Sequence, residues 1–221
     1  MLAHVYCAST YGVDAHLIDV ETHAVNGLPK YFLVGLPDRA ISESRDRIEA
    51  AISNSGLEMP RGRITVNLAP ANLPKEGSSF DLSIAVGLLA MSRQISHDKL
   101  AYTLILGELA LDGSLRPVKG ILPMTLEAKE RGLRQVVIPK VNAREAAVVE
   151  GIDIYGFSNL AEVVQWLSGY RDLKPARVKV NELFRVERSG VMPDFCDVKG
   201  QENVKRAMEV AAAGGHNIIM L

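Results

Sequence analysis

Short apolar runs separated by turn residues dominate the first seventy residues of the chain. The runs are rich in Val, Ile, Tyr and Leu, which is typical of β-strands. The predicted strands are residues 5–8, 15–20, 31–34 and 64–68. Asn26-Gly27 is a dipeptide favoured in tight hairpins, so it predicts a turn of that type.

Residues 39–55 have the apolar spacing of an amphipathic helix. Asp38 is placed to cap its start and Gly56 to end it. Two ion pairs at i,i+4 spacing are expected on its polar face. They are Glu43 with Arg47, and Arg45 with Glu49.

Residues 81–91 are apolar on nearly every side, which predicts a buried helix. The remaining predictions are strands at 103–106, 136–138 and 152–155, helices at 121–131, 143–149 and 160–167, and a hairpin at Asp112-Gly113. Strands and helices mix without strict βαβ alternation, which indicates an α+β fold with a mixed sheet.

The pattern changes after residue 170. Residues 171–193 are polar and aperiodic, so they are expected to be a linker between a domain at 1–170 and a second segment at 194–221. In that segment an amphipathic helix ends at Gly214-Gly215 and precedes Ile218-Ile219-Met220-Leu221. These four residues predict a buried strand. Because the strand would lack its sheet partners, we expect this segment to be the start of a truncated second domain.

The composition is that of an ordinary globular protein. Hydrophobic residues make up 48% and charged residues 23%, which excludes a disordered chain, and the 18 Gly show no collagen-like period. The net charge of 25 − 26 = −1 argues against a strongly basic nucleic-acid module, though not against a local basic patch. Cys7 and Cys196 lie far apart, which fits a reduced cytoplasmic compartment, and neither a signal peptide nor a membrane helix is predicted.

The densest polar cluster is residues 74–81, PKEGSSFD, between a strand and the buried helix. A serine at a helix start is a candidate nucleophile if a base lies nearby, because backbone N–H groups there stabilise an oxyanion. The alternative is that Ser78, Ser79 and Asp81 only cap the helix. Glu76 with Asp81 is a further candidate, as a carboxylate pair or as solvated loop charges.

The sequence also bears on phosphate-binding and metal-binding sites. Five arginines lie close together in the sequence and are candidate phosphate contacts, although interspersed acids also fit a surface of salt bridges. They are Arg39, Arg45, Arg47, Arg61 and Arg63. The five histidines have no metal-ligand spacing, so no metal site is predicted, and no G-x-x-x-x-G-K-[ST] phosphate loop is present.

Two stretches resemble a known family. Residues 34–90, which include VGLPDRAISESRDR and ANLPKEGSSFDL, closely resemble the N-terminal domain of the ComM/YifB family, also described as magnesium-chelatase-like, ChlI-type AAA+ ATPases. Residues 195–221, FCDVKGQENVKRAMEVAAAGGHNIIML, resemble the opening of its AAA+ module, just before the Walker A loop. The resemblance implies that Val198 and Gly200 lie on the adenine side of an incomplete nucleotide site.

The family resemblance also implies a fold like the proteolytic domain of Lon and like domain 2 of ribosomal protein S5. Ser79 then falls at the position of the Lon nucleophile. Gly107-Glu108, Gly113 and Pro117 match a second Lon motif, and continuing that alignment places Met124 at the position of the catalytic lysine. Methionine does not accept the serine proton. Lys119 and Lys129, five residues to either side, are expected to point elsewhere on the helix, so the dyad is expected to be absent.

Three functions are therefore weighed. The first is a non-catalytic module for DNA guidance or hexamer assembly in an ATP- and Mg²⁺-dependent helicase, which the resemblance implies promotes branch migration in natural transformation. The second is a surviving peptidase that uses Ser79 with Lys75 or another lysine. The third is a magnesium-chelatase-like ATPase partner, for which no porphyrin site is expected. The resemblance predicts a cytoplasmic homo-oligomer without cofactor in these residues, and DNA as partner.

Overall fold

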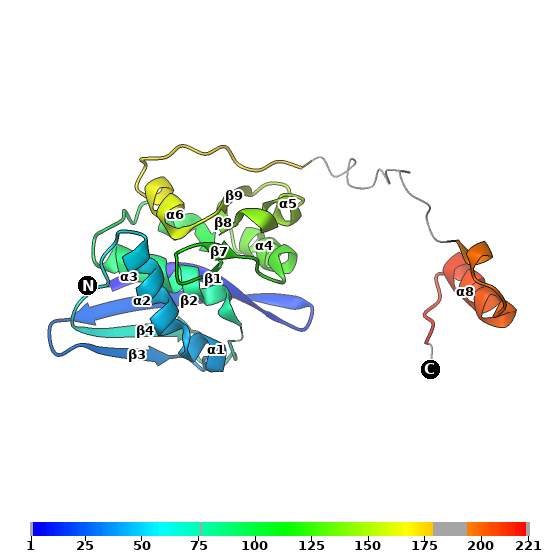
Figure 1. Cartoon of the computed structure of the whole chain (residues 1–221), viewed down its shortest axis with the longest axis horizontal. Coiled ribbons are helices and arrows are strands. Elements are labelled where there is room, and N and C mark those ends of the chain that lie inside the picture. Colours follow the sequence, from blue (N-terminus) through cyan, green and yellow to red (C-terminus); the bar gives the residue numbers. More distant parts are fainter. Residues whose placement is uncertain (1, 76, 179–193, 220–221) are drawn as a thin grey trace. The chain divides into compact units, whose positions relative to one another are not determined.

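The structure, a computed structural model, describes residues 2–75, 77–178 and 194–219 (Figure 1). The chain divides into two compact units, residues 1–179 and 180–221. The first unit is a mixed α/β structure with a seven-stranded, mostly parallel sheet, which agrees with the predicted mixture of strands and helices.

The sheet has the strand order β3-β4-β2-β1-β5-β8-β9, from bottom to top in Figure 1. Its strands are β1 Leu2–Tyr11, β2 Asp14–Val25, β3 Lys30–Val34, β4 Arg63–Ala69, β5 Thr103–Ile105, β8 Gln135–Pro139 and β9 Asp153–Phe157. Strands β6 Glu108–Leu109 and β7 Leu115–Arg116 form the hairpin predicted at Asp112-Gly113.

The hairpin predicted at Asn26-Gly27 is wrong. β3 does not pair with β2, because β4 lies between them, antiparallel to β2 and parallel to β3. The tight hairpin instead joins β1 to β2 across Gly12-Val13, where Tyr11 pairs with Asp14. Gly12 has a φ of 64°, a conformation that glycine adopts without strain. β3 is therefore an edge strand.

The predicted helix at 39–55 forms as two pieces. They are α1 Arg39–Ser42, whose cap is the Asp38 carboxylate, and α2 Ser44–Asn54. The other helices of the first unit are α3 Asp81–Met91, α4 Ile121–Glu130, α5 Ala143–Ala146 and α6 Leu160–Leu167, with 3₁₀ turns η1 Ser78–Phe80, η2 Leu100–Tyr102 and η3 Lys140–Asn142. Every residue of α3 is buried, as predicted.

The first unit extends beyond residue 170. Ala176 donates its backbone N–H to the Ile154 carbonyl at 2.8 Å, and Arg177 pairs with Asp153 at 2.7 Å. Residues 171–178, assigned above to the linker, thus belong to the first unit, and Ala176 and Arg177 contact β9. The rest of that predicted linker, residues 179–193, lies outside the described residues.

The second unit contains η4 Phe195–Asp197 and α8 Glu202–Gly214, and none of the described residues in these two elements is buried. The predicted strand at 218–221 is wrong where it is described, because Ile218 and Ile219 are exposed and outside any strand. Met220 and Leu221 lie outside the described residues. Among the helices that the structure describes, none is long and apolar enough to cross a membrane.

Candidate functional site

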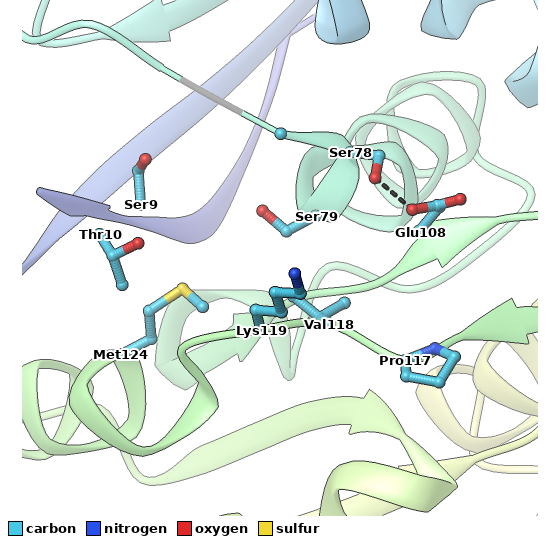
Figure 2. A pocket seen from close by; sticks show the side chains of 10 residues that line it. Ser9, Thr10, Ser78, Ser79, Glu108, Pro117, Val118, Lys119 and Met124 are labelled. Atoms are coloured by element: carbon cyan, nitrogen blue, oxygen red, sulfur yellow. Dashed lines mark hydrogen bonds between the residues drawn. The ribbon is translucent and has the colours of Figure 1, made fainter.

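The loop before α3 brings Ser79 into a pocket of about 280 Å³, here called the serine pocket. Its polar side chains are Ser9, Thr10, Ser78, Ser79, Glu108 and Lys119, and its apolar ones are Pro117, Val118 and Met124. Figure 2 shows Ser79 above Lys119, with Thr10 and Met124 to one side. Ser79 and Met124, paired above only by the family register, thus line the same pocket.

The two serines differ in their partners. The Ser78 hydroxyl donates to the Glu108 carboxylate, which Arg116 also contacts at 3.3 Å. Among the described residues, no hydrogen bond engages the Ser79 hydroxyl. Neither serine caps a helix, because Gly77 and Phe80 occupy the N-cap positions of η1 and α3 without side-chain bonds. The capping interpretation is therefore wrong for Ser78 and Ser79.

Two lysines are candidate partners of Ser79, and they differ in their surroundings. Lys75 is fully buried, and its amine donates to the Pro70 carbonyl; desolvation lowers the pKa of this amine. Lys119 lines the serine pocket, contrary to the expectation from helical rotation. The reason is that α4 begins at Ile121, so Lys119 precedes the helix. No lysine amine among the described residues is hydrogen-bonded to Ser79.

Asp81 is buried and forms an ion pair with the half-buried Arg47. The Arg47 Nε and Nη2 atoms donate to its two carboxylate oxygens at 3.0 and 3.1 Å, and the Leu109 N–H donates at 3.3 Å. Burial raises the pKa of Asp81 to about 6, although the Arg47 hydrogen bond opposes the shift. The predicted pairing of Arg47 with Glu43 is wrong, as is a capping role for Asp81. Its suggested partner Glu76 lies outside the described residues.

The arginines predicted as phosphate contacts have different surroundings in the structure. Arg47 is held by Asp81, and Arg39 pairs with Glu43 at 2.7 Å on α1. Arg45 and Arg61, by contrast, line a second cavity of about 390 Å³ together with Lys30 and Tyr31. These four residues are here called the basic pocket.

The basic pocket combines positive charge with an aromatic ring. The Arg45 guanidinium lies 5.7 Å from the centre of the Tyr31 ring. Arg63 lies 4.8 Å from the centre of the Phe32 ring, but this pair is on the opposite face of the sheet, because Tyr31 and Phe32 are consecutive on β3. Among the described residues lining the pocket, Glu49 is the one acid, 3.9 Å from Arg45. The Tyr31 hydroxyl is buried without a hydrogen-bond partner, and burial raises the pKa of Tyr31 above its usual range.

Sequence reasoning missed Lys30 and Tyr31. They lie on β3, more than ten residues from the arginines, and reach them only because β3 pairs with β4. It also missed a cluster on neighbouring strands, where the ligand atoms of His4, Asp19 and Glu21 lie within 4.8 Å of one another. His4 contacts Asp19 at 3.3 Å, as in an ordinary surface ion pair.

The nucleotide-site candidates lie in the second unit. Val198 follows η4 and accepts a hydrogen bond from the Lys205 amine at 3.1 Å, and Gly200 has a φ of 74°. An adenine contact at these residues needs a phosphate-binding loop that the 221 residues do not contain. The described residues thus do not by themselves fit ATP.

Two family models match the chain. Residues 20–142 match the family described as subunit ChlI of Mg-chelatase, and residues 194–221 match the one described as magnesium chelatase, subunit ChlI. The first match covers more than half of the chain.

Curated relatives match over the whole chain. The competence protein ComM of Haemophilus influenzae is 43% identical over 221 residues, and YifB of Escherichia coli is 42% identical over 220. The chain spans 43% and 42% of these two proteins, less than half of their length. Lon protease 2 of Bacillus subtilis is 25% identical over 143 residues, which are 63% of this chain and 25% of that protease.

Proposed function

Because the chain belongs to the ChlI-type, magnesium-chelatase-like family that includes ComM and YifB, we propose that it is the N-terminal module of a ComM-like AAA+ ATPase and guides DNA. The longer protein would use ATP and Mg²⁺ as a hexameric helicase in branch migration during natural transformation. The first unit would have the Lon-like fold of ribosomal protein S5 domain 2, reused without peptidase chemistry.

The observation that carries this proposal is the basic pocket. Lys30, Arg45 and Arg61 offer phosphate contacts, and Glu49 alone opposes them among the described lining residues. Tyr31 supplies an aromatic ring in the same pocket, a surface on which an unpaired base can stack. Cations beside an aromatic ring suit single-stranded better than fully paired DNA, since paired bases hide their faces.

The test is fluorescence anisotropy of the 221-residue chain with single-stranded and forked DNA over a salt series. Changing Lys30, Arg45, Arg61 and Arg63 to Ala is expected to weaken binding at low salt by at least about tenfold and to flatten the salt dependence, because fewer counterions are released. The matched control removes the same charge elsewhere, by changing Arg39, Lys129, Arg131 and Arg144 to Ala.

The comparison of the two quadruple variants tests whether the basic pocket has a specific role in DNA binding. Equal losses in both quadruple variants would contradict a specific role for the basic pocket. Absence of binding by the folded chain at low salt would contradict DNA guidance. It would favour subunit assembly instead, for which the β3 edge offers exposed Phe32, Val34 and Leu36.

A further inference from the structure

The serine pocket contains polar groups that the protein leaves without partners. Ser9 is only 8% exposed, yet no hydrogen bond among the described residues engages its hydroxyl. The same is true of the hydroxyls of Thr10 and Ser79, and no carboxylate in the described chain pairs with Lys119. Thr10 and Lys119 are exposed and Ser79 is half-buried, so these free donors are accessible to a ligand that brings hydrogen-bond acceptors.

The charges around the pocket favour an anion with a single charge. Lys119 is a cation without a counterion in the described chain. Glu108 lies on the same wall, but its carboxylate is held by the Ser78 hydroxyl and by Arg116. A dianion loses more hydration than a monoanion on entering the pocket, and Lys119 is the one cation among the described lining residues that offsets this loss.

The remaining wall is apolar. Pro117, Val118 and Met124 line it, and Met124 is 2% exposed. A lysine at this position would place a second cation in the pocket, whereas the flexible methionine side chain fits its surface to a small aliphatic group. Figure 2 shows Met124 and Lys119 on the same side of the pocket, facing Ser79 and Thr10.

From these features we infer that the serine pocket binds the carboxylate of a small aliphatic acid. Lys119 pairs with the carboxylate, the hydroxyls of Ser79, Thr10 and Ser9 donate to it, and Val118 and Met124 contact the aliphatic group. The volume of about 280 Å³ admits either a free short-chain acid or the last residue of a peptide, which offer the same chemistry. This site is independent of the basic pocket and of DNA.

The test follows the methyl group of Met124 by NMR in the 221-residue chain labelled with ¹³C-methyl methionine, with the signal assigned through Met124→Leu. The probes are isobutyrate, N-acetyl-Ala-Val with a free carboxylate, the same dipeptide with a terminal amide, and inorganic phosphate. We expect a saturable shift with an affinity near 1 mM, about that of one ion pair and one small apolar contact, for the acids and none for the amide.

The variants separate binding from structure. Lys119→Gln is expected to weaken isobutyrate binding at least about tenfold because the charged hydrogen bond is lost. Lys129→Gln, which removes the same charge from α4, should bind as the parent does. The inference is overturned by the absence of a saturable shift, by equal affinity in Lys119→Gln, or by phosphate binding as tightly as the acids. If only the dipeptide acid binds, the ligand is a peptide end; if both acids bind equally, it is a free acid.

Discussion

Arg47→Ala is expected to lower the free energy of unfolding by about 3–5 kcal/mol at pH 7.5, because it leaves the Asp81 carboxylate buried without its charge partner. Arg47 also donates to the Ala40 carbonyl at 3.1 Å, so the change loosens α1 and α2 from α3. Chemical denaturation monitored by circular dichroism measures the loss. Arg39→Ala, which breaks an exposed pair on α1, is the control and should change stability little.

The pH dependence distinguishes a buried charge from lost packing. Asp81 has a pKa of about 6 in the folded chain against an ordinary 3.8, so the folded state binds its proton more readily. Its contribution to stability therefore increases as pH falls from about 6 towards about 4. The penalty of Arg47→Ala should shrink at pH 5, and adding Asp81→Asn should restore part of the stability at pH 7.5. A penalty that is the same at both pH values would contradict this explanation.

Gly35→Ala is expected to destabilise the first unit by about 2–5 kcal/mol and to detach β3. The φ of Gly35 is 106°, and a Cβ atom there would lie 2.2 Å from the Leu68 carbonyl oxygen. That atom belongs to the backbone of β4, so neither side chain rotation nor a small shift relieves the overlap. Backbone strain and overpacking each contribute about 1–3 kcal/mol.

The matched control for this substitution is Gly132→Ala. Gly132 also has a positive φ, of 81°, but a Cβ atom there would meet nothing within 4 Å. The control should cost only the backbone strain, about 1–2 kcal/mol. Amide hydrogen exchange should show faster exchange in β3 for Gly35→Ala and unchanged exchange for Gly132→Ala. Equal destabilisation by both variants would contradict the prediction, because it would show that the overlap of the added Cβ atom with the Leu68 carbonyl adds no cost.

Most helices and strands could be predicted from the sequence, but the elements and side chains with which they pair could not. The apolar run of α3 and the β-rich runs of β1 to β4 depend on neighbouring residues, so periodicity detects them. The partner of β3 depends on residues more than thirty positions away, and a local turn dipeptide carries no information about it. The pairing of Arg47 was missed for the same reason, because its partner Asp81 lies 34 residues away in the sequence.

The candidate sites show the same limit. The family register placed Ser79 and Met124, and both line one pocket. Lys119 was excluded by applying helical rotation to it, although it precedes the helix predicted at 121–131. In the structure Gly120 has a left-handed conformation and occupies the N-cap position of α4. The arginines at 39–63 formed one group in the sequence, and the fold divided them into internal pairs and a surface that includes Lys30.

The position of β5 has a consequence for how the chain is made. β1 is paired on one side with β2 immediately after it, but on the other side with β5, where Tyr6 lies opposite Leu104. Since synthesis proceeds from the N-terminus, β1 to β4 emerge from the ribosome well before β5. Until then the nascent chain presents β1 as an open edge, the kind of surface at which unfinished chains associate. A pause in translation before residue 103 would therefore prolong the period in which this protein depends on chaperones.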